Sequence, residues 1–265
     1  MSTLTVLGSG NLLPHPTRGS AGHAVEWGDG SVLLLDCGAG VLKGLAQARL
    51  PWERITLILL SHYHTDHVGD LLSLLWAFRH GGIRARQLPL TVVGPPGLHA
   101  LWQDFRTRAG RWVDEASDSL HLRELPDSCT SQEIGLEVKD LKLRTHPVRH
   151  SRGAVAWRIE MRDGQLGYTG DTGPYPGLDG FFRNVDVLVS ECGQWDPPGT
   201  PLHFSPSGLA AMAAGARPGL LVLTHRPPGM EGEQALDLLR RAGYTGRAVA
   251  PMDGFRVPLV SPRNP

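Results

Sequence analysis

A dense group of potential metal ligands lies just after the apolar run 55–60. His62, His64, Asp66 and His67 follow one another there in the pattern H-x-H-x-D-H. Imidazole and carboxylate together suit Zn²⁺ and also accept Mn²⁺ or Fe²⁺. Ions of this kind lower the pKa of a bound water from about 15.7 to about 7, which supplies hydroxide at neutral pH. The pattern therefore predicts a metal-dependent hydrolase.

Three further candidate ligands, His150, Asp171 and His225, each follow a strand-like run of the sequence. Because the sites of open α/β sheets lie outside the carboxyl ends of strands, these residues can meet the first group at one edge. A structural zinc site is closed by four ligands, often cysteines, whereas a catalytic site keeps an open position. Seven ligands without a cysteine therefore favour two ions with room for water and substrate.

The elements that must position these residues alternate between strand-like and helix-like runs separated by Gly/Pro turns. The predicted strands are residues 4–7, 24–27, 32–36, 55–60, 90–93, 134–139, 141–149, 154–160, 165–169, 185–190, 220–224 and 247–250. The predicted helices are residues 41–48, 68–79, 97–109, 207–216 and 231–242. The run 55–60 is apolar apart from Thr56, which is typical of a strand buried on both faces. Ser205 is the expected N-cap of the fourth helix, with Pro206 at its first position.

No low-complexity linker divides the chain, so residues 1–265 are predicted to form a single domain. Strands in both halves with helices outside them fit an α/β fold, an αββα sandwich in which two mixed β-sheets are flanked by helices. No stretch approaches the roughly 18 apolar residues of a membrane helix. Residues 1–13 also lack the pattern of a signal peptide. We therefore expect a cytoplasmic protein without membrane contact.

Charge and cysteine content argue against other classes of protein. Basic and acidic residues balance at 26 each, whereas nucleic-acid binders usually carry a basic surplus. Cys37, Cys129 and Cys192 are odd in number and far apart, so we interpret them as buried residues and not as a disulfide framework. One basic surplus lies in residues 79–111, where a polyanion could bind but a solvated face is the favoured interpretation. Its arginines are Arg79, Arg84, Arg86, Arg106, Arg108 and Arg111.

Taken together, these motifs resemble those of the metallo-β-lactamase-fold hydrolases over nearly the whole chain. The shared elements are Gly8-Ser9-Gly10, Leu35-Asp36-Cys37-Gly38, the H-x-H-x-D-H motif, His150, Gly170-Asp171-Thr172 and Leu223-Thr224-His225. The resemblance implies an αββα sandwich with two ions at its upper edge. It implies that His62, His64 and His150 hold the first ion. It also implies that Asp66, His67 and His225 hold the second ion, and that Asp171 bridges the two.

Within that family the sequence is most similar to the phosphodiesterases. These include RNase Z, a tRNA 3′-processing endonuclease, and the bacterial cyclic-phosphate phosphodiesterases. Asp171, and not a cysteine, occupies the bridging position, and His203 precedes a predicted helix upstream of His225, as in RNase Z-like enzymes. The resemblance implies that His203 gives a proton to the leaving group and that Asp66 orients the attacking hydroxide. It also allows a homodimer.

The chain also departs from RNase Z. It has no Gly/Pro-rich inserted arm of the kind that grips tRNA, and its net charge is zero. We therefore predict a phosphodiesterase that acts on a small or cyclic phosphate ester through a hydroxide shared by two divalent ions, with RNA as a less favoured substrate. A lactonase or thioesterase on the same metals is the alternative, because the fold alone does not fix the function. A non-catalytic binding protein is a further alternative, which the full set of ligand residues argues against.

Several residues keep two interpretations at this stage. His146 competes with His150, but His150 has the spacing to the following strand that the family shows. His203 sits in a Pro/Gly-rich stretch and could be an exposed loop residue. Asp36 could be a turn former, or it could orient a ligand histidine through the ring N–H of that histidine. Arg18, in the early loop, could meet a phosphate, but we expect it to be exposed to solvent.

Overall fold

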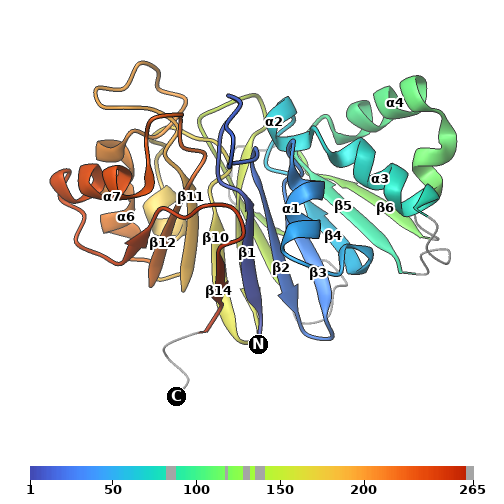
Figure 1. The fold of residues 1–265 in the computed structure, drawn as a ribbon, viewed down its shortest axis with the longest axis horizontal. Helices are drawn as coiled ribbons and strands as arrows, with labels where there is room; N and C mark the ends of the chain where they lie inside the picture. The colour runs from blue at the N-terminus through green and yellow to red at the C-terminus, as the bar shows by residue number, and fades with distance from the viewer. Residues whose placement is uncertain (82–87, 117–118, 128–131, 135–140, 261–265) are drawn as a thin grey trace.

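Two seven-stranded β-sheets stacked against each other form the middle of the structure, and helices cover both outer faces (Figure 1). The structure is a computed structural model that describes residues 1–81, 88–116, 119–127, 132–134 and 141–260. These layers confirm the predicted αββα sandwich. No helix in the described ranges is long and apolar enough to cross a membrane.

The first sheet has the strand order β14-β1-β2-β3-β4-β5-β6. Its strands are β1 (Thr3–Gly8), β2 (Gly22–Trp27), β3 (Ser31–Leu35), β4 (Ile55–Leu59), β5 (Leu90–Gly94), β6 (Leu120–Glu124) and β14 (Arg256–Pro258). Strands β14, β1, β2 and β3 pair antiparallel. Strands β3, β4, β5 and β6 pair parallel, so their carboxyl ends lie at the same edge of the sheet.

The second sheet has the order β13-β12-β11-β10-β9-β8-β7 and the same division into two kinds of pairing. Its strands are β7 (Gln132–Ile134), β8 (Lys142–Pro147), β9 (Val155–Met161), β10 (Gly164–Tyr168), β11 (Val187–Glu191), β12 (Leu220–Thr224) and β13 (Ala248–Val249). Strands β7 to β10 pair antiparallel. Strands β10 to β13 pair parallel, and the site described below is built on the ends of three of them.

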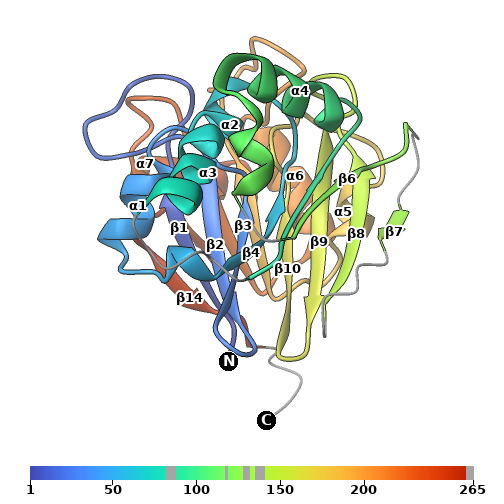
Figure 2. The ribbon, with the colours of Figure 1, turned by 90° about the vertical axis from the view of Figure 1, so that its right-hand side faces the viewer.

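Helices cover the outer face of each sheet. Those of the first half are α1 (Val41–Gln47), α2 (Thr65–Val68), α3 (Leu71–His80) and α4 (Leu98–Ala109), with 3₁₀ turns at Trp52–Arg54 and Arg111–Glu115. Those of the second half are α5 (Leu178–Phe181), α6 (Pro206–Ala216) and α7 (Gly232–Arg241). Figure 2 looks onto the side of α3 and α4, which lie in front of the first sheet.

Three separate groups of buried apolar side chains hold these layers together. The central group joins the two sheets and includes Leu57, Trp157 and Val189. A second group packs α1, α3 and α4 against the first sheet, and a third packs α5, α6 and α7 against the second sheet. Burial of apolar area on this scale is the dominant favourable term in folding.

Strand β4 shows why its sequence is apolar at every position except Thr56. Side chains alternate between the two faces of a strand. Leu57 and Leu59 therefore face the other sheet in the central group, whereas Ile58 packs in the group beneath the helices. Because both faces are covered, the strand is held firmly and fixes the position of the H-x-H-x-D-H motif that follows it.

The predicted elements agree with the structure in most of the described chain. All five predicted helices are present, and Ser205 caps α6 by accepting a hydrogen bond from the Gly208 backbone N–H at 3.4 Å. The short elements β6, β14, α2 and α5 and the two 3₁₀ turns were not predicted. Most of the predicted strand 134–139 lies outside the described residues. Cys37 and Cys192 are buried, as expected, and Cys129 lies outside the described residues.

The basic surplus of residues 79–111 is partly neutralised by acids that follow it in the chain. Arg79 forms an ion pair with Glu115 at 2.9 Å, and Arg106 forms one with Asp114 at 3.0 Å. Both acids belong to the 3₁₀ turn Arg111–Glu115, which packs beside α3 and α4. They follow residue 111, so a count of charges over residues 79–111 did not include them. Arg84 and Arg86 lie outside the described residues. These contacts weaken the case for a polyanion-binding face.

Candidate active site

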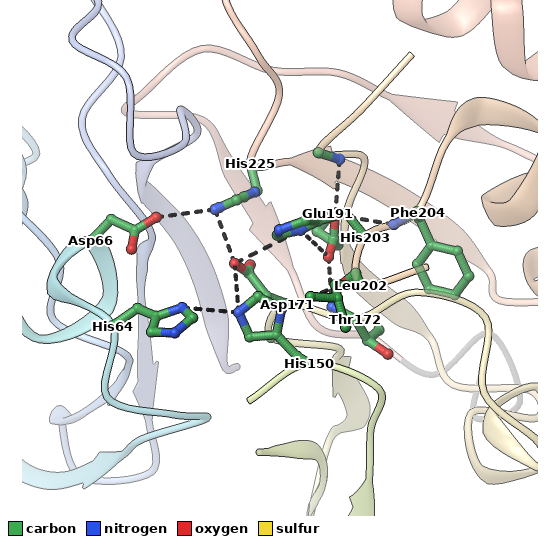
Figure 3. A network of polar contacts seen from close by, with 12 residues as sticks. His64, Asp66, His150, Asp171, Thr172, Glu191, Leu202, His203, Phe204 and His225 are labelled. Atoms are coloured by element: carbon green, nitrogen blue, oxygen red, sulfur yellow. Dashed lines mark hydrogen bonds and ion pairs between the residues drawn. The ribbon is translucent and has the colours of Figure 1, made fainter. Parts of the chain in front are cut away.

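The seven predicted ligands meet at one edge of the sandwich, where strands of both sheets end. His62 and His64 follow β4, while Asp66 and His67 belong to α2. His150, Asp171 and His225 follow β8, β10 and β12 of the second sheet. Figure 3 shows how side chains from these separate segments point toward one another. The site is therefore assembled only when the two sheets pack together.

The backbone divides the H-x-H-x-D-H motif into two pairs. His64 has an extended conformation (φ −62°, ψ 150°) directly before α2. Residues two apart in an extended segment share a side, whereas Asp66 and His67 turn away on the helix. The result is two groups of potential ligands, and within each group all ligand atoms lie within 4.8 Å of one another. The first group is His62, His64 and His150, and the second is Asp66, His67, Asp171 and His225.

The carboxylate of Asp171 lies between these two groups (Figure 3). It is 3.2 Å from Nε2 of His67 and 3.2 Å from Nε2 of His225 in the second group. It is also 3.7 Å from Nε2 of His150 and 4.0 Å from Nε2 of His62 in the first group. Burial alone would raise the pKa of Asp171, but His225 and His67 outweigh burial and hold this pKa well below its usual value.

Asp36 lies behind the ligand groups and is fully buried. Its Oδ2 accepts hydrogen bonds from Nδ1 of His67 at 2.7 Å and from the hydroxyl of Tyr168 at 2.6 Å. Its Oδ1 accepts one from the backbone N–H of Ser61 at 2.7 Å. A carboxylate that receives the second ring N–H of a histidine fixes the orientation and tautomer of that ring. The contact with His67 is the one expected of a residue that orients a ligand histidine.

Two site residues adopt the left-handed backbone region that favours glycine. Asp36 has φ 56° at the end of β3, and His225 has φ 54° at the end of β12. Such conformations cost on the order of 1–3 kcal/mol and cluster at functional sites. In both cases the turn comes directly after a parallel strand.

Glu191, the last residue of β11, is a site residue that the sequence reasoning missed. It is 2% exposed, and its Oε1 accepts hydrogen bonds from Nδ1 of His203 at 2.9 Å and from the Thr172 backbone N–H at 2.5 Å. Burial lowers the pKa of His203, but the hydrogen bond and charge of Glu191 outweigh burial and raise this pKa above its usual value. The signal was available, because Glu191 ends a parallel strand as the ligand segments do.

His203 itself lies beside the cluster, as the proton-donor hypothesis requires. Its Nδ1 is 4.0 Å from Asp171 Oδ2, and its ring stacks on that of His225 with centroids 5.6 Å apart. The side chain is 20% exposed, so it is open to a substrate as well as held by Glu191. It is not the freely exposed loop residue of the alternative interpretation.

The chemistry of the cluster fits divalent cations. Three buried polar atoms make no well-formed hydrogen bond among the described residues: His62 Nε2, and the pair His67 Nε2 and Asp171 Oδ1, which lie 3.2 Å apart. Buried polar atoms rarely lack a partner, so each such atom calls for an explanation. Burial lowers the pKa of His150 to about 4, which leaves a neutral imidazole that can donate a lone pair. The side chains therefore supply the donors of metal sites without filling their coordination.

The structure separates His150 from its competitor His146. His150 Nε2 is 3.0 Å from Nδ1 of His64 within the first group. His146 instead packs against Tyr175 and Phe181, with ring centroids 5.9 and 5.2 Å away, outside both groups.

A family profile described as the Beta-lactamase superfamily domain matches residues 32–226 of this chain. The chain belongs to the metallo-β-lactamase superfamily. The matched span contains every predicted ligand residue from His62 to His225. The predicted family is confirmed, and the chain is a metal-dependent hydrolase of this superfamily.

Individual members of the superfamily match the chain over almost its whole length. Ribonuclease Z from Mycolicibacterium paratuberculosis is 30% identical over 283 residues, covering 99% of this chain and 100% of the relative. The metallo-β-lactamase-fold protein YhfI from Bacillus subtilis superposes with a TM-score of 0.80 at 24% identity, over 97% of this chain and 98% of that one. The short form of human tRNase Z superposes with a TM-score of 0.76 at 20% identity, over 97% and 99%.

The two histidines near the end of β8 give a direct test of the ligand assignment. His150→Ala should lose roughly one of two bound ions per chain, because it removes a nitrogen from the first group. His146→Ala should keep the wild-type metal content, because His146 lies outside both groups. Metal per chain, measured by mass spectrometry on proteins with matching circular dichroism, decides between them. The reverse pattern in the two variants would show that the ligand assignment is wrong.

Proposed function

We propose that this superfamily member is a phosphodiesterase that holds two divalent ions, Zn²⁺ first among the candidates. The observation that carries the proposal is the end-to-end relation to curated ribonucleases Z at 30% identity, which have a phosphodiester bond as their target. The ligand groups described above would hold the ions, with Asp171 between them. When bound, such ions supply positive charge to phosphoryl oxygens and lower the pKa of water.

Asp66 is the residue best placed to orient an attacking water. Its Oδ2 is 3.3 Å from Nε2 of His225 and 3.9 Å from Nε2 of His67. Burial would raise the pKa of Asp66, but the hydrogen bond with His225 and the charges of His67 and His225 together outweigh burial and lower it. An ionised carboxylate accepts hydrogen bonds and donates none, so it can hold a water with its lone pair directed at phosphorus.

His203 would protonate the departing oxygen as a general acid. Its Nδ1 is engaged by Glu191, which leaves Nε2 as the nitrogen that can give up a proton. Glu191 is itself fixed by the backbone N–H groups of Thr172 and Gly193, at 2.5 and 2.8 Å. The hydrogen bond and charge of Glu191 raise the pKa of His203, which favours the protonated ring that a general acid needs.

A small or cyclic phosphate ester is the substrate that we propose. The net charge of the chain is zero, and two arginines of the 79–111 segment are already paired with acids. A small ester needs no broad basic surface, because two ions and His203 can contact its single phosphate. RNA is the second candidate, and the relation to ribonucleases Z favours it. We expect the protein to act in the cytoplasm, and a homodimer is compatible with this proposal.

The role of His203 can be tested by varying the leaving group. p-Nitrophenolate leaves with little help, whereas an alkoxide needs a proton. His203→Ala should therefore lower kcat on an alkyl phosphodiester by about 10²–10⁴-fold and have a much smaller effect on the p-nitrophenyl ester. Glu191→Gln should show the same selectivity in weaker form. Equal losses on both esters would remove the general-acid role from His203.

The reaction class can be tested with a substrate panel on the metal-loaded protein. The panel contains bis-p-nitrophenyl phosphate, cyclic nucleotides, a ribose cyclic phosphate, precursor tRNA and acyl lactones, with Asp171→Asn as the inactive control. We expect phosphodiester turnover that the control lacks, and higher kcat/KM on a small ester than on precursor tRNA. Lactone hydrolysis with no phosphodiester turnover would contradict the proposed class. Preference for precursor tRNA would replace only the proposed substrate.

A further inference from the structure

The loop that carries His203 joins β11 to α6 and comprises residues 192–205. The structure describes all of this loop and has no helix or strand in it, and residues 195–199 are exposed. Loops on the surface are generally more mobile than the elements they connect. The position of His203 therefore depends on contacts made within the loop and at its ends.

The end of this loop lies directly against the ligand groups. The carbonyl oxygen of Leu202 is 3.3 Å from Nδ1 of His150. The carbonyl oxygen of Pro201 approaches Gly173 so closely that a Cβ on Gly173 would be 1.8 Å from it. Figure 3 shows Leu202 and His203 beside the ring of His150. A shift of the loop would therefore move His203 relative to the ligand groups.

The side chain of Gln194 uses its full hydrogen-bonding capacity inside this loop. Its Nε2 donates to the carbonyls of His203 at 2.6 Å and of Thr200 at 2.8 Å. Its Oε1 accepts from the backbone N–H groups of Gly199 at 3.0 Å and of Thr200 at 3.1 Å. An amide side chain offers two N–H donors and one oxygen with two lone pairs, so every one of them has a partner. Polar networks that are fully satisfied in this way make a structure rigid.

Gln194 and Glu191 hold His203 at two different places. Glu191 accepts a hydrogen bond from the ring at Nδ1, whereas Gln194 donates to the backbone carbonyl. The backbone N–H of Gln194 also donates to the Phe204 carbonyl at 3.3 Å, so the beginning of the loop is tied to its end. A ring that is held at one nitrogen keeps its direction only if its backbone is fixed as well. The amide of Gln194 supplies that second constraint.

We propose that Gln194 is a positioning residue for proton transfer by His203. This inference rests on the proposed function, in which the Nε2–H bond of His203 breaks and the proton goes to the departing oxygen. The electron pair of the breaking P–O bond stays on that oxygen and accepts the proton. Gln194 takes no part in the transfer and acts only by fixing where Nε2 lies. Such placement matters, because a misplacement of about 1 Å can cost about 100-fold in rate.

Kinetics on the metal-loaded protein with the alkyl and p-nitrophenyl phosphodiesters test this proposal. Gln194→Ala should lower kcat on the alkyl ester by about 10- to 100-fold and have a much smaller effect on the p-nitrophenyl ester. Gln194→Glu keeps the size and the two acceptor contacts but cannot donate to the carbonyls, so it should show the same selectivity. Gln47→Ala, at an exposed glutamine of α1, is the matched control and should behave as the wild type. Thermal melts and metal per chain are compared for all variants.

A double-mutant cycle shows whether Gln194 acts through His203. Residues that act as one unit are not additive, so Gln194→Ala should cause little further loss of kcat on the alkyl ester when His203→Ala is already present. Full additivity of the two changes would overturn the proposal. Equal losses on both esters, or wild-type kinetics of Gln194→Ala, would overturn it too.

A second measurement separates this proposal from the proposed function. If the wild type hydrolyses neither ester, the proposed function fails, and NMR of the zinc-loaded protein then decides the role of Gln194. The Nδ1 proton of His203, held by Glu191, should give a slowly exchanging signal in the wild type and in Gln47→Ala. This signal should exchange faster or disappear in Gln194→Ala and Gln194→Glu. An unchanged signal in both Gln194 variants, or its absence from the wild type, would overturn the positioning role.

Discussion

The buried carboxylate of Asp171 is the charge around which the candidate site is organised. It is 3% exposed, and five histidine rings lie within 4.0 Å of it. An ionised carboxylate removed from water is stable only when positive charge surrounds it. That charge can come from protonated histidines or from divalent ions, and the buried Nε2 of His62, which has no hydrogen-bond partner among the described residues, fits the second source. The need of the buried Asp171 carboxylate for nearby positive charge therefore explains why so many potential ligands converge on it.

The two sheets each add a second carboxylate that holds one histidine in place. Asp36, at the end of β3, fixes the ring of His67 in the second ligand group. Glu191, at the end of β11, fixes the ring of His203 beside the cluster. The same kind of contact has a different effect in each place, because His67 faces Asp171 at 3.2 Å whereas His203 is partly open to solvent. Under the proposed function, one sheet would thus orient a metal ligand, His67, and the other would hold the proton donor, His203.

The sandwich and the seven clustered residues could be predicted because the segments that carry these residues follow recognisable strands. The change from extended to helical backbone then divides the H-x-H-x-D-H motif into two pairs. It could not predict contacts between segments far apart in the chain. Glu191 and Tyr168 matter through partners 12 and 132 residues away, at His203 and Asp36. Arg18 was expected to be exposed, because nothing local indicates that the 227–231 loop covers it. Strand β6 is half exposed and strand β14 has only three residues, so neither shows enough apolar alternation to be predicted as a strand.

The central proposal is that these side chains would hold two ions, with Asp171 placed to serve both ligand groups. Anomalous diffraction at the zinc edge, on crystals of the metal-loaded protein, tests it most directly. The account predicts two peaks roughly 3.5–4 Å apart, as in other two-metal hydrolases. One peak should lie beside His62, His64 and His150, and the other beside Asp66, His67 and His225. A single peak between the groups, or zinc bound only elsewhere on the protein, would contradict it.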